Sequence, residues 1–202
     1  SGVIPLVLAH LHTNAKVTGV ELQAAMAERA RRNVELNERQ GQIRIIAGDV
    51  RAVGQFGARA SFDVVVCNPP YRKPGTGRIS PNDEKQIARH EIHGELGDFV
   101  GAAAYLLRAK GRLAMVYGAE RAVDLLSSLS RAQLEPKRLR LVQSFVDSEA
   151  LLILVEAVKQ GRSGVEILPP LIVYREGKEY SEEVAAMIAG KKVLAAKDAK
   201  SA

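Results

Sequence analysis

The sequence contains one cysteine, Cys67, and no tryptophan among its 202 residues. A single cysteine cannot form an internal disulfide, so the disulfide-stapled scaffolds of small secreted proteins are excluded. The longest apolar runs, such as Ala150–Val155, fall far short of the ~20 residues that a membrane-spanning helix requires. No charged and then apolar leader opens the chain. These absences predict a cytoplasmic protein without a membrane segment.

Excess charge of one sign is scarce outside the C-terminal tail, residues 191–202. The net charge is +6, and half of it comes from the tail, where four lysines face one aspartate. We interpret this Lys/Ala-rich tail as a solvated helix end rather than a nucleic-acid arm. Residues 1–190 have the length of one domain, and 47% hydrophobic and 26% charged residues exclude a disordered chain.

Short β-branched runs alternate along the chain with stretches of helical spacing, which is typical of an α/β fold. The expected helices are Val3–Leu11, Leu22–Arg39, Asp98–Ala109 with Asp98 as its cap, Ala119–Arg131 and a helix capped by Ser181. The expected strands are Lys16–Val20, Ile43–Ala47, Phe62–Cys67, Arg112–Tyr117, Lys137–Phe145, Ala150–Lys159 and Ile172–Tyr174. A parallel crossover needs a dozen or more residues, so the short turn between Lys137–Phe145 and Ala150–Lys159 predicts an antiparallel pair.

Polar residues follow three of the expected strands, where ligands bind in an open α/β sheet. They are Glu21, Asp49 and Asn68. Glu21 lies 19 residues after Gly2, and an acidic residue at about this distance from a glycine turn contacts ribose hydroxyls in Rossmann-type sites. Alternatively, Glu21 is an acid favoured at a helix start, and Asp49 is a turn residue beside Gly48.

The motif Asn68-Pro69-Pro70-Tyr71 directly follows the apolar strand Phe62–Cys67. Prolines have a fixed φ and no N–H, so they hold the carbonyls of this segment in a stiff geometry. The Asn68 side-chain oxygen and the Pro69 carbonyl can accept hydrogens from a planar amino group, while Tyr71 stacks on its ring. Such acceptors favour attack by the amine lone pair. The alternative is a rigid turn.

These residues resemble the amino-group branch of S-adenosylmethionine-dependent methyltransferases, in which an Asn/Asp-Pro-Pro-Tyr motif follows the fourth strand. The resemblance implies a Rossmann-like class I methyltransferase sheet and S-adenosyl-L-methionine as the cofactor. The catalytic residues that it implies are those of the motif, Asn68, Pro69, Pro70 and Tyr71. The cofactor-binding residues that it implies are Gly2, Glu21, Asp49, Val50 and Asn68.

The C-terminal segments Leu168–Arg175 and Tyr180–Val184 resemble a narrower group, the bacterial tRNA (adenine-N6)-methyltransferases that modify the adenosine beside the anticodon of a valine tRNA. This resemblance implies methyl transfer to adenine N6 and tRNA as the partner. The same tetrapeptide occurs in the glutamine N5-methyltransferases of peptide-chain release factors, which generally lack this C-terminal extension. A non-catalytic RNA-binding protein of the same fold is the third alternative.

A long segment without periodic apolar residues, Arg72–Gly97, follows the motif. Its first part, Arg72–Arg89, holds five basic residues and two acidic ones, a local net charge of +3. We expect Arg72, Lys73 and Arg78 to contact phosphates beside an unstacked adenine, because an amine inside a base stack is out of reach. The alternative is a solvated lid.

The chain departs from the methyltransferase pattern at its N-terminus. The first strand of these enzymes and most of their glycine loop would precede Ser1. That strand is central in their sheet, so we expect Lys16–Val20 and Asp63–Cys67 to lack a ladder partner. We interpret the 202 residues as a fragment of a longer protein, or as a chain whose missing strand is supplied separately.

No metal site is expected. His10 and His12 diverge on a helix, and His90 and His93 lack the i, i+4 spacing of a helical zinc site. Cys67 lies within an apolar strand, so we interpret it as a core residue rather than a nucleophile.

Overall fold

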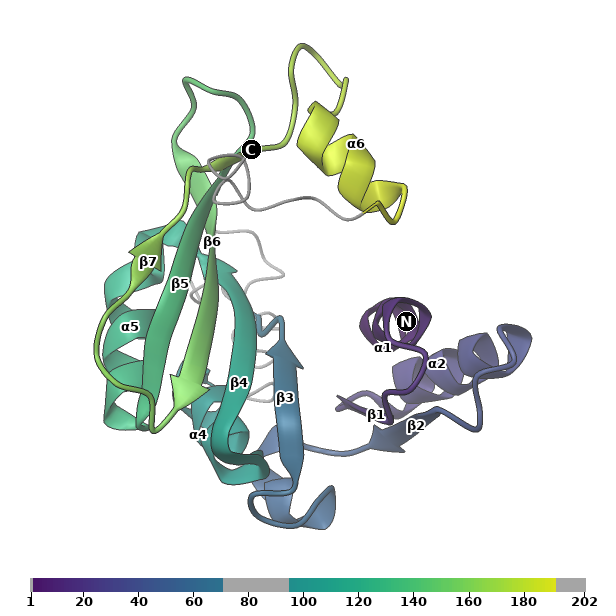
Figure 1. The fold of residues 1–202 in the computed structure, drawn as a ribbon. Coiled ribbons are helices and arrows are strands. Elements are labelled where there is room, and N and C mark those ends of the chain that lie inside the picture. Colours follow the sequence, from purple (N-terminus) through teal and green to yellow (C-terminus); the bar gives the residue numbers. More distant parts are fainter. Residues whose placement is uncertain (1, 71–94, 192–202) are drawn as a thin grey trace, which may run out of the picture.

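The computed structural model describes residues 2–70 and 95–191. Helices and strands alternate as expected up to residue 143, and three further strands and a helix follow (Figure 1). The helices are α1 (Val3–Leu11), α2 (Ala24–Leu36), α4 (Leu96–Leu106), α5 (Ala122–Arg131) and α6 (Glu182–Ile188), with short 3-10 helices η1 (Val50–Gln55) and η2 (Ala119–Arg121). The strands are β1 (Val17–Glu21), β2 (Ile43–Ala47), β3 (Phe62–Cys67), β4 (Leu107–Gly118), β5 (Leu134–Gln143), β6 (Ala150–Lys159), β7 (Glu166–Ile167) and β8 (Leu171–Ile172). None of the helices in this part of the chain has the length and apolar character needed to cross a bilayer.

The larger of two sheets has the strand order β3-β4-β6-β5-β7, and β8 also pairs with β5. β3 and β4 are parallel, whereas β6 runs antiparallel to both β4 and β5. The predicted antiparallel pair is therefore confirmed. β6 lies between β4 and β5. Although β6 follows β5 in the chain, it is the strand that joins β5 to β4 and β3.

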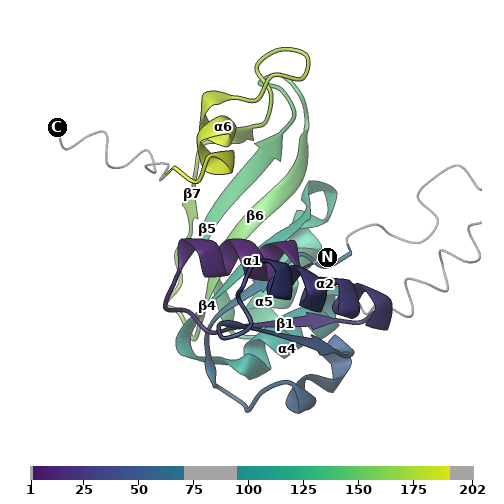
Figure 2. The ribbon, with the colours of Figure 1, turned by 90° about the vertical axis from the view of Figure 1, so that its right-hand side faces the viewer.

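The smaller sheet contains only β1 and β2, which are parallel. Among the described residues, β1 pairs on one side only and β3 pairs on one side only, as expected from the sequence. Apolar side chains beside these edges are accessible: Val20 is 41%, Val64 52% and Val66 39% exposed. Figure 2 shows the smaller sheet with α1 and α2 standing in front of the larger sheet.

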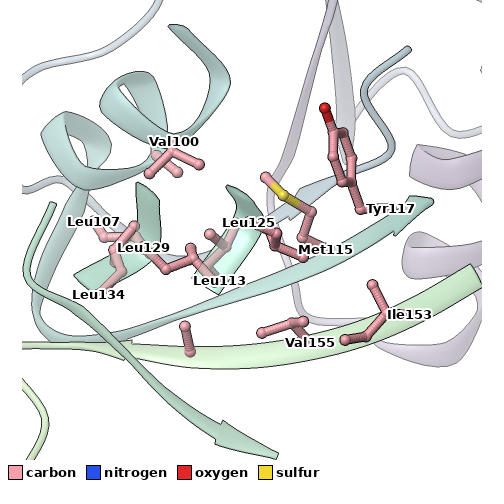
Figure 3. Packing of buried hydrophobic residues seen from close by; sticks show 12 residues of the cluster. Val100, Leu107, Leu113, Met115, Tyr117, Leu125, Leu129, Leu134, Ile153 and Val155 are labelled. Atoms are coloured by element: carbon pink, nitrogen blue, oxygen red, sulfur yellow. The ribbon is translucent and has the colours of Figure 1, made fainter. Parts of the chain in front are cut away.

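The main core lies between one face of the larger sheet and helices α4 and α5 (Figure 3). Alternate residues of a strand point to the same face, so Leu113, Met115 and Tyr117 of β4 all reach this core. They meet Leu125 and Leu129 of α5, neither of which is exposed. The rigid part of the molecule is therefore built around β4.

A second, smaller core joins α1 and α2 to the small sheet through Ala9, Val34 and Ile43. Gly2 precedes α1 with φ +77°, and a Cβ there would lie 3.1 Å from the Cβ of Ala30 in α2. A left-handed backbone and this close approach both require glycine at position 2.

The start of α4 differs from the sequence expectation. Glu95 is the N-cap residue rather than Asp98, and the Asp98 carboxylate accepts a hydrogen bond of 2.8 Å from the Glu95 N–H. This reciprocal cap uses an acid at the third helical position, which the sequence analysis placed at the cap itself. The expected cap of α6 is confirmed, because Ser181 Oγ accepts from the Val184 N–H at 3.2 Å.

Candidate functional site

Two of the predicted acidic residues lie at the carboxyl ends of neighbouring strands. Glu21 is the last residue of β1 and pairs with Ala47, the last residue of β2. The Gly48 N–H then donates to the Glu21 carbonyl oxygen at 2.9 Å. The structure thus brings Glu21 and the Gly48-Asp49 turn side by side, the arrangement in which one ligand can reach both.

The Glu21 side chain turns toward the start of α2. Its Oε1 accepts a hydrogen bond of 3.1 Å from the Gln23 N–H. This contact is also what the alternative interpretation of Glu21 as a helix-start residue predicts. In the described part of the chain, the second carboxylate oxygen accepts no hydrogen bond, so it can take a ligand hydroxyl.

The Asp49 carboxylate is engaged by Arg51, a residue that the sequence analysis did not select. Asp49 Oδ1 accepts from the Arg51 backbone N–H at 2.9 Å, and the Arg51 Nε–H lies within 3.0 Å of both carboxylate oxygens. The hydrogen bonds from Arg51 lower the pKa of Asp49 below its usual range. Asp49 therefore caps η1 and is held ionised.

The backbone beside Asp49 is tightly packed. A Cβ at Gly48 would lie 2.5 Å from the Phe56 ring, so only glycine fits between β2 and this ring. Val50 begins η1, and η1 packs against α4, where Asp98 adds a favourable charge interaction with Arg51. The loop that carries Asp49 and Val50 is thus fixed from two sides.

The described part of the catalytic motif, Asn68-Pro69-Pro70, follows β3. Asn68 and Pro70 are exposed, whereas Pro69 is fully buried. No hydrogen bond within the described residues occupies the Asn68 side chain, so its oxygen is available as an acceptor. Burial raises the pKa of the preceding Cys67 thiol to about 12, which keeps it neutral and argues for a core role.

Part of the predicted site lies outside the described residues 2–70 and 95–191. This applies to Tyr71, to Arg72, Lys73 and Arg78, and to residues 192–202 of the tail. Within the described ranges, Gly2 packs on Ala30 of α2, and no hydrogen bond joins Asn68 to Glu21 or Asp49. The structure therefore places the two acids together and Asn68 on the other sheet.

A residue missed by the sequence analysis, Arg121, is the last residue of η2, which directly follows β4. Its Nη1 donates to the Tyr117 hydroxyl at 2.7 Å, and its Nε donates to Asp124 at 3.1 Å. The guanidinium carbon is 5.3 Å from the Tyr117 ring centroid, and burial raises the pKa of Tyr117. A Glu-Arg pair directly after a buried strand was the available sequence signal.

Metal-binding residues do not cluster in the part of the chain that the structure describes, where no three His, Cys, Asp or Glu side chains gather. His90 and His93 lie outside that part.

Comparison with known families places most of the chain in one group. The profile described as methyltransferase small domain matches residues 1–132. Among curated relatives, a tRNA1(Val) (adenine(37)-N6)-methyltransferase of Porphyromonas gingivalis is 31% identical over 158 residues, which cover 77% of this chain and 61% of the relative. The same name belongs to a Haemophilus influenzae relative that is 30% identical over 117 residues, 57% of this chain and 49% of the relative. The chain spans less than two thirds of these relatives.

Solved structures share the fold. A crystal structure from Agrobacterium tumefaciens, described as a predicted O-methyltransferase, has a TM-score of 0.76 and 21% identity, covering 96% of this chain and 86% of that one. TrmN from Thermus thermophilus has a TM-score of 0.54 and 20% identity, covering 77% of this chain and 40% of that one. The expected class I, Rossmann-like fold is confirmed.

Proposed function

Because the chain belongs to the methyltransferase small domain family, we propose that it transfers a methyl group from S-adenosyl-L-methionine to adenine N6 in tRNA. The names of the curated relatives support the anticodon loop of a valine tRNA as the acceptor. The chain spans 61% of the P. gingivalis relative, so its activity and substrate are part of the proposal.

The observation that carries the proposal is the exposed Asn68 amide beside the buried Pro69 at the end of β3. Pro69 is fixed by burial, and neither Pro69 nor Pro70 has an N–H that could compete for the two acceptor oxygens. An amino group held by both oxygens has its hydrogens oriented and its lone pair directed away from them. This geometry suits an amine acceptor better than a hydroxyl.

The residues around Glu21 and Asp49 fit the proposed cofactor. Two carboxylates at adjoining strand ends match a ribose diol and a purine amino group, which donate hydrogen bonds. The cofactor supplies an electrophilic methyl group when bound. Gly48 packs against Phe56 directly before Asp49, and Gly2 is the N-cap residue of α1.

The acceptor side of the proposal rests on the motif and on the segment that follows it. Tyr71 would stack on the target base, at a cost of ~1–3 kcal/mol in binding when it is replaced by alanine. Arg72, Lys73 and Arg78 would contact flanking phosphates. Neutralising all three should weaken tRNA binding and reduce its salt dependence by about one unit of slope per lost contact.

The test is a methyl-transfer assay with labelled S-adenosylmethionine and two acceptors, an unmodified valine tRNA transcript and a peptide-chain release factor. Incorporation at adenine N6 of the tRNA supports the proposal. Methylation of the release factor without the tRNA would replace it by glutamine N5 methylation. Cofactor binding without incorporation into either would favour a non-catalytic RNA-binding protein.

A further inference from the structure

The guanidinium of Arg121 lies beyond the end of β4, the strand that pairs with the strand carrying the catalytic motif. Cys67 and Met115 form the last pair of the β3–β4 ladder, and Pro69 and Tyr117 each follow that pair by two residues. Both side chains are fully buried. Arg121 donates to the Tyr117 hydroxyl and lies over its ring. Because β3 and β4 are parallel, Arg121 and the turn that carries Asn68 follow the same edge of the sheet.

Two hydrogen bonds orient this guanidinium, and its Nη2 group takes part in neither of them. Asp124 takes the Nε–H, and Tyr117 takes a hydrogen of Nη1. The Arg121 side chain is 23% exposed, so the group is partly accessible. A planar guanidinium with five N–H donors is rigid once two are fixed.

The surrounding charge decides which ligand atom suits Arg121. Asp124 binds it directly, and the Glu120 carboxylate folds back over Gly118, where a Cβ would lie 2.6 Å from its oxygens. Two carboxylates and one guanidinium give this position a net negative charge. A phosphate would be repelled, whereas a neutral hydrogen-bond acceptor would not.

We propose that Arg121 is a specificity-determining residue that donates a hydrogen bond from Nη2 to the acceptor atom beside the reactive amino group of the substrate. In adenine this atom is N1, which is bonded to the carbon that carries the amine, or N7, which lies on the other side of the amine. The amine meets the acceptor oxygens of Asn68 and Pro69 while its neighbour meets a donor, so a base with the reverse pattern is rejected. This inference rests on the proposed function.

The test combines Arg121→Met with stem-loop RNAs that carry adenosine, 1-deazaadenosine or 7-deazaadenosine at the methylated position. We expect Arg121→Met to lower kcat/KM on the adenosine RNA by roughly 10- to 100-fold. One of the deaza RNAs should be an equally poor substrate for the unaltered protein. Arg121→Met should cause no further loss on that RNA, because the hydrogen bond is already missing.

Arg112→Met is the matched control. Arg112 of β4 forms an ion pair of 3.1 Å with Glu156 and, because side chains alternate along a strand, lies on the opposite face of the sheet from Tyr117. It should leave kcat/KM within about twofold on all three RNAs. If the losses from Arg121→Met and from both deaza substitutions multiply, Arg121 acts only through folding and the inference is wrong. If the unaltered protein methylates no adenosine RNA, the proposed function itself fails.

Discussion

Asn68 contributes a single acceptor oxygen to the proposed reaction. Removing this oxygen should lower turnover without lowering cofactor affinity. Asn68→Ala should lower turnover by at least roughly 100-fold, by analogy with the loss of one preorganised polar group at a reacting centre. Cofactor affinity, measured by calorimetry, should stay nearly unchanged because Glu21 and Asp49 lie on the other sheet. Asn68→Asp is the control and should retain more turnover, since it keeps an acceptor. Full turnover in Asn68→Ala would contradict the assignment.

The Asp49–Arg51 pair predicts a pH effect of known sign. Asp49 has a lowered pKa in the folded protein, so its pairing stabilises the native state above the ordinary carboxyl range and is lost as pH falls through the lowered value. In Arg51→Ala the pKa of Asp49 should rise toward the ordinary ~3.9. Carboxyl NMR titration measures this. An unchanged Asp49 pKa would mean that Arg51 is not its cause.

At the scale of elements, the C-terminal helix α6 is attached to the sheet through β5. Arg140 forms two hydrogen bonds of 2.6 Å with Glu183 of α6 and one of 2.9 Å with the Pro169 carbonyl. Arg140→Met should release α6 from β5 and cost roughly 1–3 kcal/mol of unfolding free energy, because the pair is largely shielded. Hydrogen exchange should accelerate in Glu182–Ile188.

The matched control for this change is Arg175→Met. Arg175 pairs with Glu182 at 3.5 Å, and the two side chains are 57% and 90% exposed. An exposed pair contributes about 0–1 kcal/mol, so exchange in α6 should hardly change. Equal acceleration in both variants would show that the Arg140 contacts do not hold α6 specifically.

Elements whose ends are marked by prolines or turn residues could be predicted from the sequence. Elements whose ends are set by pairing with another strand could not. Phe62–Cys67 and Ala150–Lys159 have the predicted bounds, because apolar runs end there at prolines or a turn. β4 begins at Leu107 rather than Arg112, since polar residues join the strand by pairing with β3 across an irregular register. Similarly, the positions of Glu21 and Asp49 after strands could be predicted from their spacing in the sequence. The position of Arg121 depends instead on how β4 pairs with β3.

At the scale of the molecule, two unequal cores predict two levels of stability. The larger sheet packs twelve buried residues into one cluster, whereas the small sheet shares three with α1 and α2. Regions with few buried contacts open locally at lower free energy. We expect the amides of β1 and β2 to exchange faster than those of β4 and β6 under native conditions. Equal protection in the two sheets would show that they unfold as one unit.

The central position of β6 also has a consequence for synthesis. The chain emerges from its N-terminal side, so β4 and β5 are made before the strand that separates them. Each has β6 as its neighbour in the larger sheet, β4 in the register Met115↔Val155 and β5 in the register Leu139↔Val155. While residues 150–159 are still within the ribosome, the two earlier strands have edges that can pair with wrong partners. The nascent chain therefore joins β5 to β4 only when β6 appears.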